Sequence, residues 1–184
     1  MYSIFCQNYF KYKVPQHDTF KRYIMSSYKI DNSSKEHWNS ETRTIYFSKE
    51  ELLPVISPCL DEFCSEFSKK LQFALSEPWI NFYEKGDYQE IHTHPRYQLS
   101  LNYFLNYDKE KDAKFYFYNT HSTELAESNL DTLFGAGDCY FPDVEEGELI
   151  IFPSYLHHGV RPHRSENLRM TVTCNMHFRE FSFT

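Results

Sequence analysis

The chain has 184 residues, 41% of them hydrophobic and 18% aromatic, so it can bury a full core as a single domain, 1–184, without disulfides. A formal net charge of -7 argues against a surface that neutralises phosphates, and nucleic acid is not expected as a partner. Five cysteines without paired spacing and the lack of a signal peptide or membrane-length apolar run indicate a cytoplasmic protein with no membrane partner.

Residues 1–78 are expected to be a partly helical support. Residues 17–30 carry apolar side chains at helical spacing. Ser48 and Glu51 have the form of a capping box, and Ser57-Pro58 offers a second helix start. The apolar stripe after that start consists of Leu60, Phe63, Phe67 and Leu71. This stripe predicts an amphipathic helix that covers one face of a sheet.

Residues 79–184 alternate short runs of aromatic and β-branched residues with turn formers, which predicts strands. The runs are 79–83, 97–107, 114–118, 148–153 and 168–178. No helices are expected between them, so the fold class is mainly β with N-terminal helices, as an antiparallel sandwich or barrel. An acidic, turn-rich insertion at 119–146 is either a lid over the barrel mouth or a flexible excursion.

The last run has two faces of opposite character. One face carries Arg169, Thr171, Thr173, Asn175 and His177, and the other carries Met170, Val172, Cys174, Met176 and Phe178. We expect the polar face to line the interior of a barrel and the apolar face to pack against the amphipathic helix. A functional site would then lie inside the barrel.

Two histidines one residue apart, His92 and His94, are the strongest functional signal. Side chains at this spacing on a strand point the same way. Gly86 provides the turn that begins the strand and Pro95 ends it, so both imidazoles should lie near a barrel mouth. Taken alone, such a pair is more often two polar residues on a solvated strand than a metal site.

A second pair, His157 and His158, follows the strand that ends at Pro153-Ser154. Adjacent histidines on an extended segment cannot both face inward, so one is a ligand at most. Three imidazoles on one face of a metal leave positions open, which suits Fe(II), with Mn, Ni or Cu as competitors. The simpler interpretation is a pair of surface histidines in a loop.

Arg169 stands on the inward face with Thr171 beside it. A guanidinium with a neighbouring hydroxyl forms a fork for a carboxylate. Because a buried unpaired arginine is costly, an anionic ligand would resolve it. The alternative is an ordinary ion pair with Glu90 or an acidic loop residue.

These residues make the chain resemble the Fe(II)/2-oxoglutarate-dependent oxygenases, in particular the small ones of phages and bacteria. The stretches that carry the resemblance are 79–81, 86–95, 99–103, 147–160 and 169–175, within the last hundred residues or so. It implies a double-stranded β-helix (jelly-roll or cupin-like) packed against amphipathic helices. It also places the core at 79–184.

The resemblance also implies roles for individual residues. His92 and His158 would be iron ligands, because alignment on Phe152-Pro153-Ser154 selects His158 over His157. Arg169 would bind the distal carboxylate of 2-oxoglutarate, with help from Thr171. Further co-substrate contacts would come from Asn81, Tyr83, Tyr103 and Asn175.

The chain departs from the family at His94, which stands where the family has a carboxylate ligand. Three neutral imidazoles would leave the iron site one charge unit more positive than the family's usual set of two imidazoles and one carboxylate. Glu90 shares strand parity with His92 and is the other candidate, although its spacing is wrong. A halogenase is disfavoured, because His94 would fill the position that halide needs.

The same strands also resemble a cupin. Gly86, His92 and His94 match the first cupin motif, with Gln98 in place of its glutamate, and the second motif matches around His158. Cupins commonly use a histidine pair at this point. Arg169 and the Phe-Pro-Ser segment favour the oxygenase.

The prediction is therefore an Fe(II)- and 2-oxoglutarate-dependent hydroxylase with metal ligands His92, His94 and His158 and no catalytic residue beyond the metal centre. It would oxidise a substrate C–H bond with O2 and yield succinate and CO2. The alternatives are a cupin-type dioxygenase or isomerase that does not use 2-oxoglutarate, and a non-catalytic β-sandwich. The substrate is a small molecule or a peptidyl side chain such as proline, and a homodimer is left open. A phage-encoded enzyme would work in the host cytoplasm.

Overall fold

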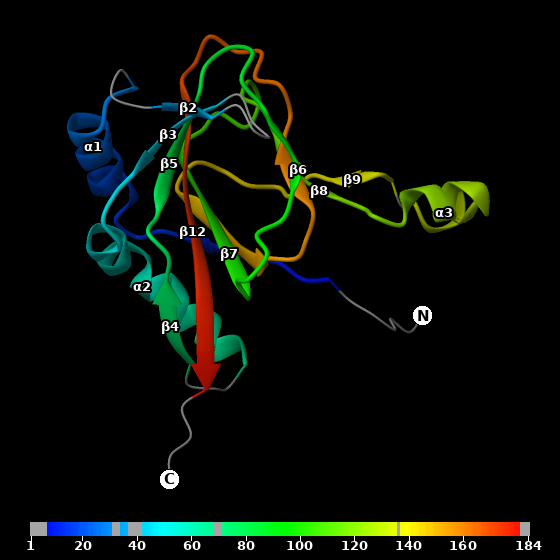
Figure 1. Cartoon of the computed structure of the whole chain (residues 1–184), viewed down its shortest axis with the longest axis horizontal. Helices are drawn as coiled ribbons and strands as arrows, with labels where there is room; N and C mark the ends of the chain where they lie inside the picture. The colour runs from blue at the N-terminus through cyan, green and yellow to red at the C-terminus, as the bar shows by residue number, and fades with distance from the viewer. Residues whose placement is uncertain (1–6, 31–33, 37–41, 68–70, 136, 181–184) are drawn as a thin grey trace.

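The computed structural model describes residues 7–30, 34–36, 42–67, 71–135 and 137–180. Two β-sheets face each other, and two helices cover the outer face of the larger one (Figure 1). Every strand pair within these ranges is antiparallel. The mainly β prediction with N-terminal helices is confirmed.

The larger sheet has the order β1-β10-β7-β12-β5-β3-β2, and β4 pairs with the far half of β12. Its strands are β1 (Phe10–Lys13), β2 (Ser34–Glu36), β3 (Thr42–Tyr46), β4 (Leu71–Leu75), β5 (Trp79–Tyr83), β7 (Leu99–Asn106), β10 (Glu148–Pro153) and β12 (Arg169–Glu180). The smaller sheet has the order β6-β11-β8-β9, formed by β6 (Gln89–His92), β11 (His158–Val160), β8 (Phe115–Tyr118) and β9 (Cys139–Tyr140). All five predicted strands are present, with ends within two residues of those expected.

Helices α1 (His17–Ser27) and α2 (Lys49–Glu66) form a hydrophobic core with the outer face of the larger sheet. The β12 side chains in that core are Met170, Val172, Cys174 and Met176, as the alternation predicts. Phe178, the last residue of the predicted apolar face, is exposed and lies outside that core. The opposite side chains Arg169, Thr171, Thr173 and Asn175 are also buried, on the face turned toward the smaller sheet. Only His177 of the predicted polar face is exposed, beside Tyr97.

The predicted second helix start at Ser57-Pro58 is wrong, because α2 runs without a break through both Pro54 and Pro58. Pro58 has no N–H to donate to the Pro54 carbonyl, and the Ser57 hydroxyl donates to that carbonyl instead, at 3.3 Å. Both prolines lie on the exposed face of the helix, where their rings meet water. The apolar stripe of the helix therefore starts about two turns before Leu60, at Leu52, and stops at Phe63.

Two further details at the ends of α2 differ from the expectation. Ser48 caps the helix by accepting from the Glu50 N–H at 3.3 Å, but Glu51 does not close a capping box. Its carboxylate accepts hydrogen bonds from the hydroxyls of Tyr23 and Tyr28 of the first helical segment. Leu71, counted in the helical stripe, begins β4.

A second hydrophobic cluster fills the space between the sheets and includes Phe104, Phe115, Phe152 and Val160. It fixes the distance between the larger sheet and the strands of the smaller one. The insertion at 119–146 holds α3 (Ser122–Glu127), α4 (Leu130–Phe134) and β9, so the expectation of no helices between the strands is wrong for this segment. Its α3 projects away from the sheets (Figure 1). Among the described helices, none combines the length and the apolar character of a membrane span.

Candidate metal centre

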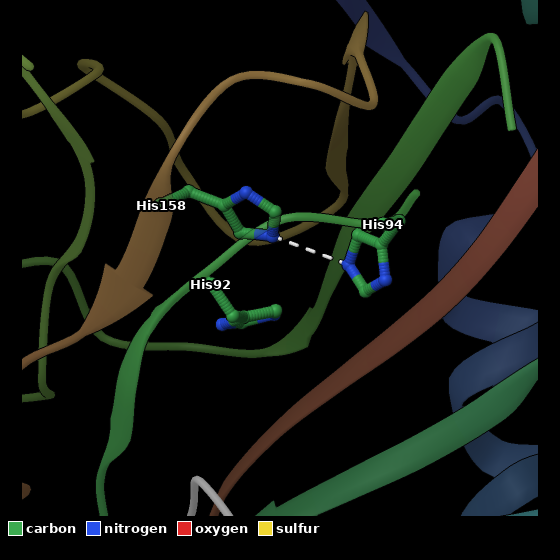
Figure 2. Close-up of side chains that lie close together, drawn as sticks. All are labelled: His92, His94 and His158. Carbon is green, nitrogen blue, oxygen red and sulfur yellow. Dashed lines mark hydrogen bonds between the residues drawn. The ribbon is translucent and has the colours of Figure 1, made fainter. Parts of the chain in front are cut away.

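Three histidines converge at one end of the smaller sheet. The ligand atoms of His92, His94 and His158 all lie within 4.8 Å of one another, and Figure 2 shows the three rings grouped together. The Nε2 atoms of His94 and His158 are 3.2 Å apart. Two nitrogens that share an ion at about 2.1 Å stand roughly 3.0–3.4 Å apart, so this spacing fits a common metal.

The main chain brings the three residues together in two ways. His92 ends β6 and His158 begins β11, and the two are paired directly across the sheet. His94 lies just beyond β6, where its N–H donates to the Ser154 carbonyl at 2.9 Å. The predicted convergence of His92 and His94 is found, although strand alternation alone does not produce it.

Hydrogen bonds set the tautomer of two of the rings. The Nδ1 of His92 is 2.8 Å from the Glu90 carbonyl, and the Nδ1 of His158 is 2.8 Å from the Leu156 carbonyl. Because a carbonyl only accepts, each Nδ1 carries the proton and donates it. The Nε2 lone pairs are then free for a metal, in the arrangement common among histidine ligands.

Burial keeps the imidazoles uncharged. It lowers the pKa of His92, and with the neighbouring His92 it lowers the pKa of His94 to about 4. The pKa of His158 is also well below its ordinary value, first through burial and then through its two histidine neighbours. All three rings are therefore neutral at pH 7, which is the form that binds metal.

The two rival residues lie elsewhere. His157 is exposed, whereas His158 is buried among Phe115 and Phe152. The Glu90 side chain lines a separate groove on the outer side of the smaller sheet. Neither residue joins the histidine cluster.

The histidines stand between two cavities. An inner cavity of about 20 Å³ is lined by all three, and an open cleft of about 460 Å³ is lined by His92 and His94. Trp79 and Gln89 line both. No described residue of 119–146 lines either cavity, so this structure does not support the lid interpretation of that segment.

Arg169 is the largest fully buried side chain, with 0% of its surface exposed. Its guanidinium carbon lies 4.4 Å from the centre of the Tyr83 ring and 5.5 Å from that of Tyr107. None of its three nitrogens has a hydrogen-bond partner of acceptable geometry in the described part of the chain. The expected alternative, an ion pair with Glu90 or an acidic loop residue, is not found there.

A family of proteins described as "Putative 2OG-Fe(II) oxygenase" matches residues 77–175 of the sequence. The match covers more than half of the chain and includes the three histidines and Arg169. The chain belongs to the Fe(II)- and 2-oxoglutarate-dependent oxygenases. Among curated proteins, no sequence matches this oxygenase.

Solved structures of the same fold include the viral collagen prolyl hydroxylase of Paramecium bursaria Chlorella virus-1 in complex with 2-oxoglutarate. It is 12% identical with a TM-score of 0.64, over 91% of this chain and 94% of that one. A prolyl-4-hydroxylase of Pseudomonas putida is 12% identical with a TM-score of 0.62, over 92% of each chain. HygX of Streptomyces hygroscopicus, solved with nickel and 2-oxoglutarate, is 12% identical with a TM-score of 0.60, over 92% of this chain and 82% of that one. These similarities establish the double-stranded β-helix.

The oxygenase uses Fe(II) as its cofactor and 2-oxoglutarate and O2 as co-substrates. The residues present fit both requirements, because the cluster offers neutral nitrogen donors and the buried guanidinium lacks an anion. Bound iron couples the oxidative decarboxylation of 2-oxoglutarate to the oxidation of a C–H bond. Family membership argues against the cupin and non-catalytic alternatives.

Other predicted co-substrate residues also line the barrel interior. Thr171 is buried on the same β12 face as Arg169. The Tyr83 ring packs against the guanidinium, and its hydroxyl donates to Gln89 Oε1 at 3.2 Å. Asn81 donates to the Thr173 hydroxyl at 3.2 Å, and Asn175 accepts from Ser100 at 2.7 Å.

Tyr103 is not brought to this site. It belongs to the core beneath the helices, and its hydroxyl bonds to Nδ1 of His17 at 2.8 Å. The sequence could have excluded Tyr103 from the barrel interior, because it has the same strand parity as the aliphatic residues Leu101 and Leu105.

Two residues of the site were missed. Asn102 lines the inner cavity and accepts from the Thr173 hydroxyl at 3.2 Å. It is an amide side chain in the middle of a fully buried stretch of β7, which could have drawn attention to it. Trp79 lies beside His94, with ring centres 5.9 Å apart, and nothing in the sequence near His94 marks it.

Proposed function

We propose that His92, His94 and His158 bind the iron of this hydroxylase, and that Arg169 with Thr171 binds the distal carboxylate of 2-oxoglutarate. The observation that carries the proposal is the buried guanidinium without a hydrogen-bond partner, in the same barrel interior as the histidines. A buried charge in this state costs several kcal/mol unless an anion pairs with it.

The side chains around this site would orient the co-substrate and exclude water. The Tyr83 ring holds one face of the guanidinium, so the N–H groups at its edge are left to donate to a carboxylate. The inner cavity of about 20 Å³ has room for about one water molecule. A five-carbon diacid must therefore displace lining side chains as it enters, and closure around it would keep bulk water from the metal.

Anaerobic titration tests the proposal. Fe(II) and 2-oxoglutarate added to the protein should give a visible metal-to-ligand charge-transfer band. Arg169→Ala should weaken 2-oxoglutarate binding about tenfold to a hundredfold, because a hydrogen bond to a charged group contributes about 1.5–3 kcal/mol. Arg179→Ala, which removes an exposed arginine on the same strand, is the matched control.

Two results would contradict the assignment. The first is a band whose dependence on 2-oxoglutarate is the same in Arg169→Ala as in the parent protein. The second is undiminished metal affinity in the double variant His92→Ala/His158→Ala.

The primary substrate and the setting of the enzyme are part of the same proposal. The relatives named prolyl hydroxylases and HygX, solved with hygromycin B bound, favour either a peptidyl side chain or a small molecule. Four free cysteines among the described residues support a cytoplasmic location, and the net charge of -7 disfavours nucleic acid. We also propose that residues 1–184 form one domain. Light scattering, which measures the molar mass in solution, tests whether two copies of the chain form a homodimer.

A further inference from the structure

The open cleft has an unusual lining for a binding site. Its aromatic residues are Tyr46, Trp79 and Tyr97, and most of its other side chains end in a hydroxyl or an amide. No lysine, arginine or aliphatic side chain contributes to the described lining. The single carboxylate, that of Glu77, is 3.7 Å from the Lys49 ammonium, which offsets its charge. The cleft is therefore neutral, polar and aromatic.

Trp79 connects the surface with the histidine cluster. Its ring lies 6.1 Å from that of Tyr46, which is 65% exposed, and 5.9 Å from that of His94. Trp79 is itself only half-buried. A flat ligand that packs on this indole would extend from the cleft mouth to the edge of the metal centre.

Thr42 supplies an independent sign of a ligand. Its side chain lines the cleft and is 1% exposed, and its Oγ1 has no hydrogen-bond partner in the described part of the chain. Leaving a buried hydroxyl unsatisfied is unfavourable, so a ligand that donates to it or accepts from it would be stabilised. Two residues further along β3, the Thr44 hydroxyl already has a partner, because it donates to the side-chain amide oxygen Oδ1 of Asn81 at 3.3 Å.

We propose that the cleft binds a neutral sugar unit, with the C–H face of the ring on Trp79 and a ring hydroxyl on Thr42. C–H bonds pack favourably on an aromatic face, and sugar hydroxyls both donate and accept, as the hydroxyls and amides of the lining do. A fatty acyl chain would find no aliphatic wall here, and a phosphorylated substrate would find no lysine or arginine in the described lining. A peptide is less suited, because its main chain offers one donor and one acceptor per residue, fewer than the hydroxyls of a sugar ring.

This inference rests on the proposed function for its chemistry. A ring C–H, O2 and 2-oxoglutarate would give a ring C–OH, succinate and CO2. One oxygen atom enters the new hydroxyl and the other enters the succinate carboxylate. The substrate class itself depends only on the cleft.

Saturation-transfer NMR on the full-length chain without added 2-oxoglutarate tests the substrate class. The probes are maltotriose, cellotriose, chitotriose and a proline-rich decapeptide. At least one saccharide should bind, at least tenfold more weakly to Trp79→Ala and several-fold more weakly to Thr42→Val. Thr42→Val keeps the β-branched shape, so it reports on the hydroxyl if Trp79→Ala does not fold. Tyr155→Ala removes an exposed ring that does not line the cleft and should bind as the parent does.

The outcomes separate this inference from the proposed function. Binding of the decapeptide alone, binding of no probe, or saccharide binding that neither cleft variant weakens would each overturn the sugar assignment. None of these results depends on iron, on 2-oxoglutarate or on Arg169.

Discussion

At the residue scale, His94 sets the charge that the proposed metal site presents. An imidazole there gives three neutral nitrogen ligands, whereas a carboxylate would remove one unit of positive charge. Nitrogen ligands favour Ni and Cu, and carboxylates suit Mn and Mg. The ligand set of this chain should therefore bind hard oxygen-preferring ions relatively poorly.

His94→Asp should raise the affinity for Mn²⁺ relative to Ni²⁺ by roughly tenfold, because it adds an oxygen donor and a negative charge. Titration calorimetry with each ion measures the ratio of the two dissociation constants. His94→Asn, which keeps the site neutral, separates the effect of charge from that of the donor atom. An unchanged ratio in His94→Asp would argue that His94 is not a ligand.

The buried cysteines lead to a prediction about thiol reactivity. Burial raises the pKa of Cys59 to about 11 and that of Cys174 to about 12. Because the thiolate is the reactive form, only a very small fraction of either group reacts at pH 8, and the rate should rise with pH up to those values. Iodoacetamide labelling followed by peptide mass spectrometry should find both unlabelled in the native protein and labelled in denaturant. Rapid labelling of Cys59 or Cys174 in the native protein at pH 8 would contradict the burial of these thiols.

At the scale of elements, β11 depends on Gly159. A Cβ on this residue would lie 2.8 Å from the Gln89 carbonyl oxygen and 2.9 Å from the Tyr116 ring. The Arg161 guanidinium covers that ring, with its carbon 4.7 Å from the ring centre. The strand next to His158 therefore has no room for a side chain at this position.

Gly159→Ala should destabilise the fold by about 1–3 kcal/mol, as overpacking does, and should weaken metal binding because β11 carries His158. Thermal unfolding and metal titration measure the two effects. Gly137→Ala is the control, since its Cβ would meet nothing closer than 3.8 Å. Equal thermal stability and equal metal affinity in Gly159→Ala and Gly137→Ala would contradict the claim that β11 has no room for a side chain at residue 159.

The strands and their inward faces could be predicted because alternation is a local property of the chain. Residues 79–83 and 148–153 were placed with both ends correct. The unbroken α2 could not be predicted, since a helix that contains prolines is stabilised by what it packs on, which is distant in the sequence. The place of Trp79 beside His94 depends on the meeting of two sheets, and no spacing encodes it.

At the scale of the whole molecule, the projecting segment of α3 and α4 is separable from the site. Its two ends meet where the Asn119 N–H donates to the Asp138 carbonyl at 2.8 Å, so a short turn could join them. The segment also lines neither cavity within the described residues.

Replacement of 120–137 by Asn-Gly, the preferred two-residue hairpin turn, should leave metal and 2-oxoglutarate affinities within about twofold of the parent values. Titration of both ligands is the measurement, and circular dichroism checks that the fold is kept. A large loss of 2-oxoglutarate affinity in a folded variant would restore the lid interpretation.

The two proposed contacts of 2-oxoglutarate come from different sheets. Arg169 begins β12 in the larger sheet, and His92 and His158 belong to the smaller one. The aromatic cluster of Phe104, Phe115 and Phe152 holds these sheets apart. The packed rings would then fix the distance between Arg169 and the histidine cluster, and this distance would match the length of the diacid. Selectivity among four-, five- and six-carbon diacids would thus be set by hydrophobic side chains that never touch the co-substrate's charges.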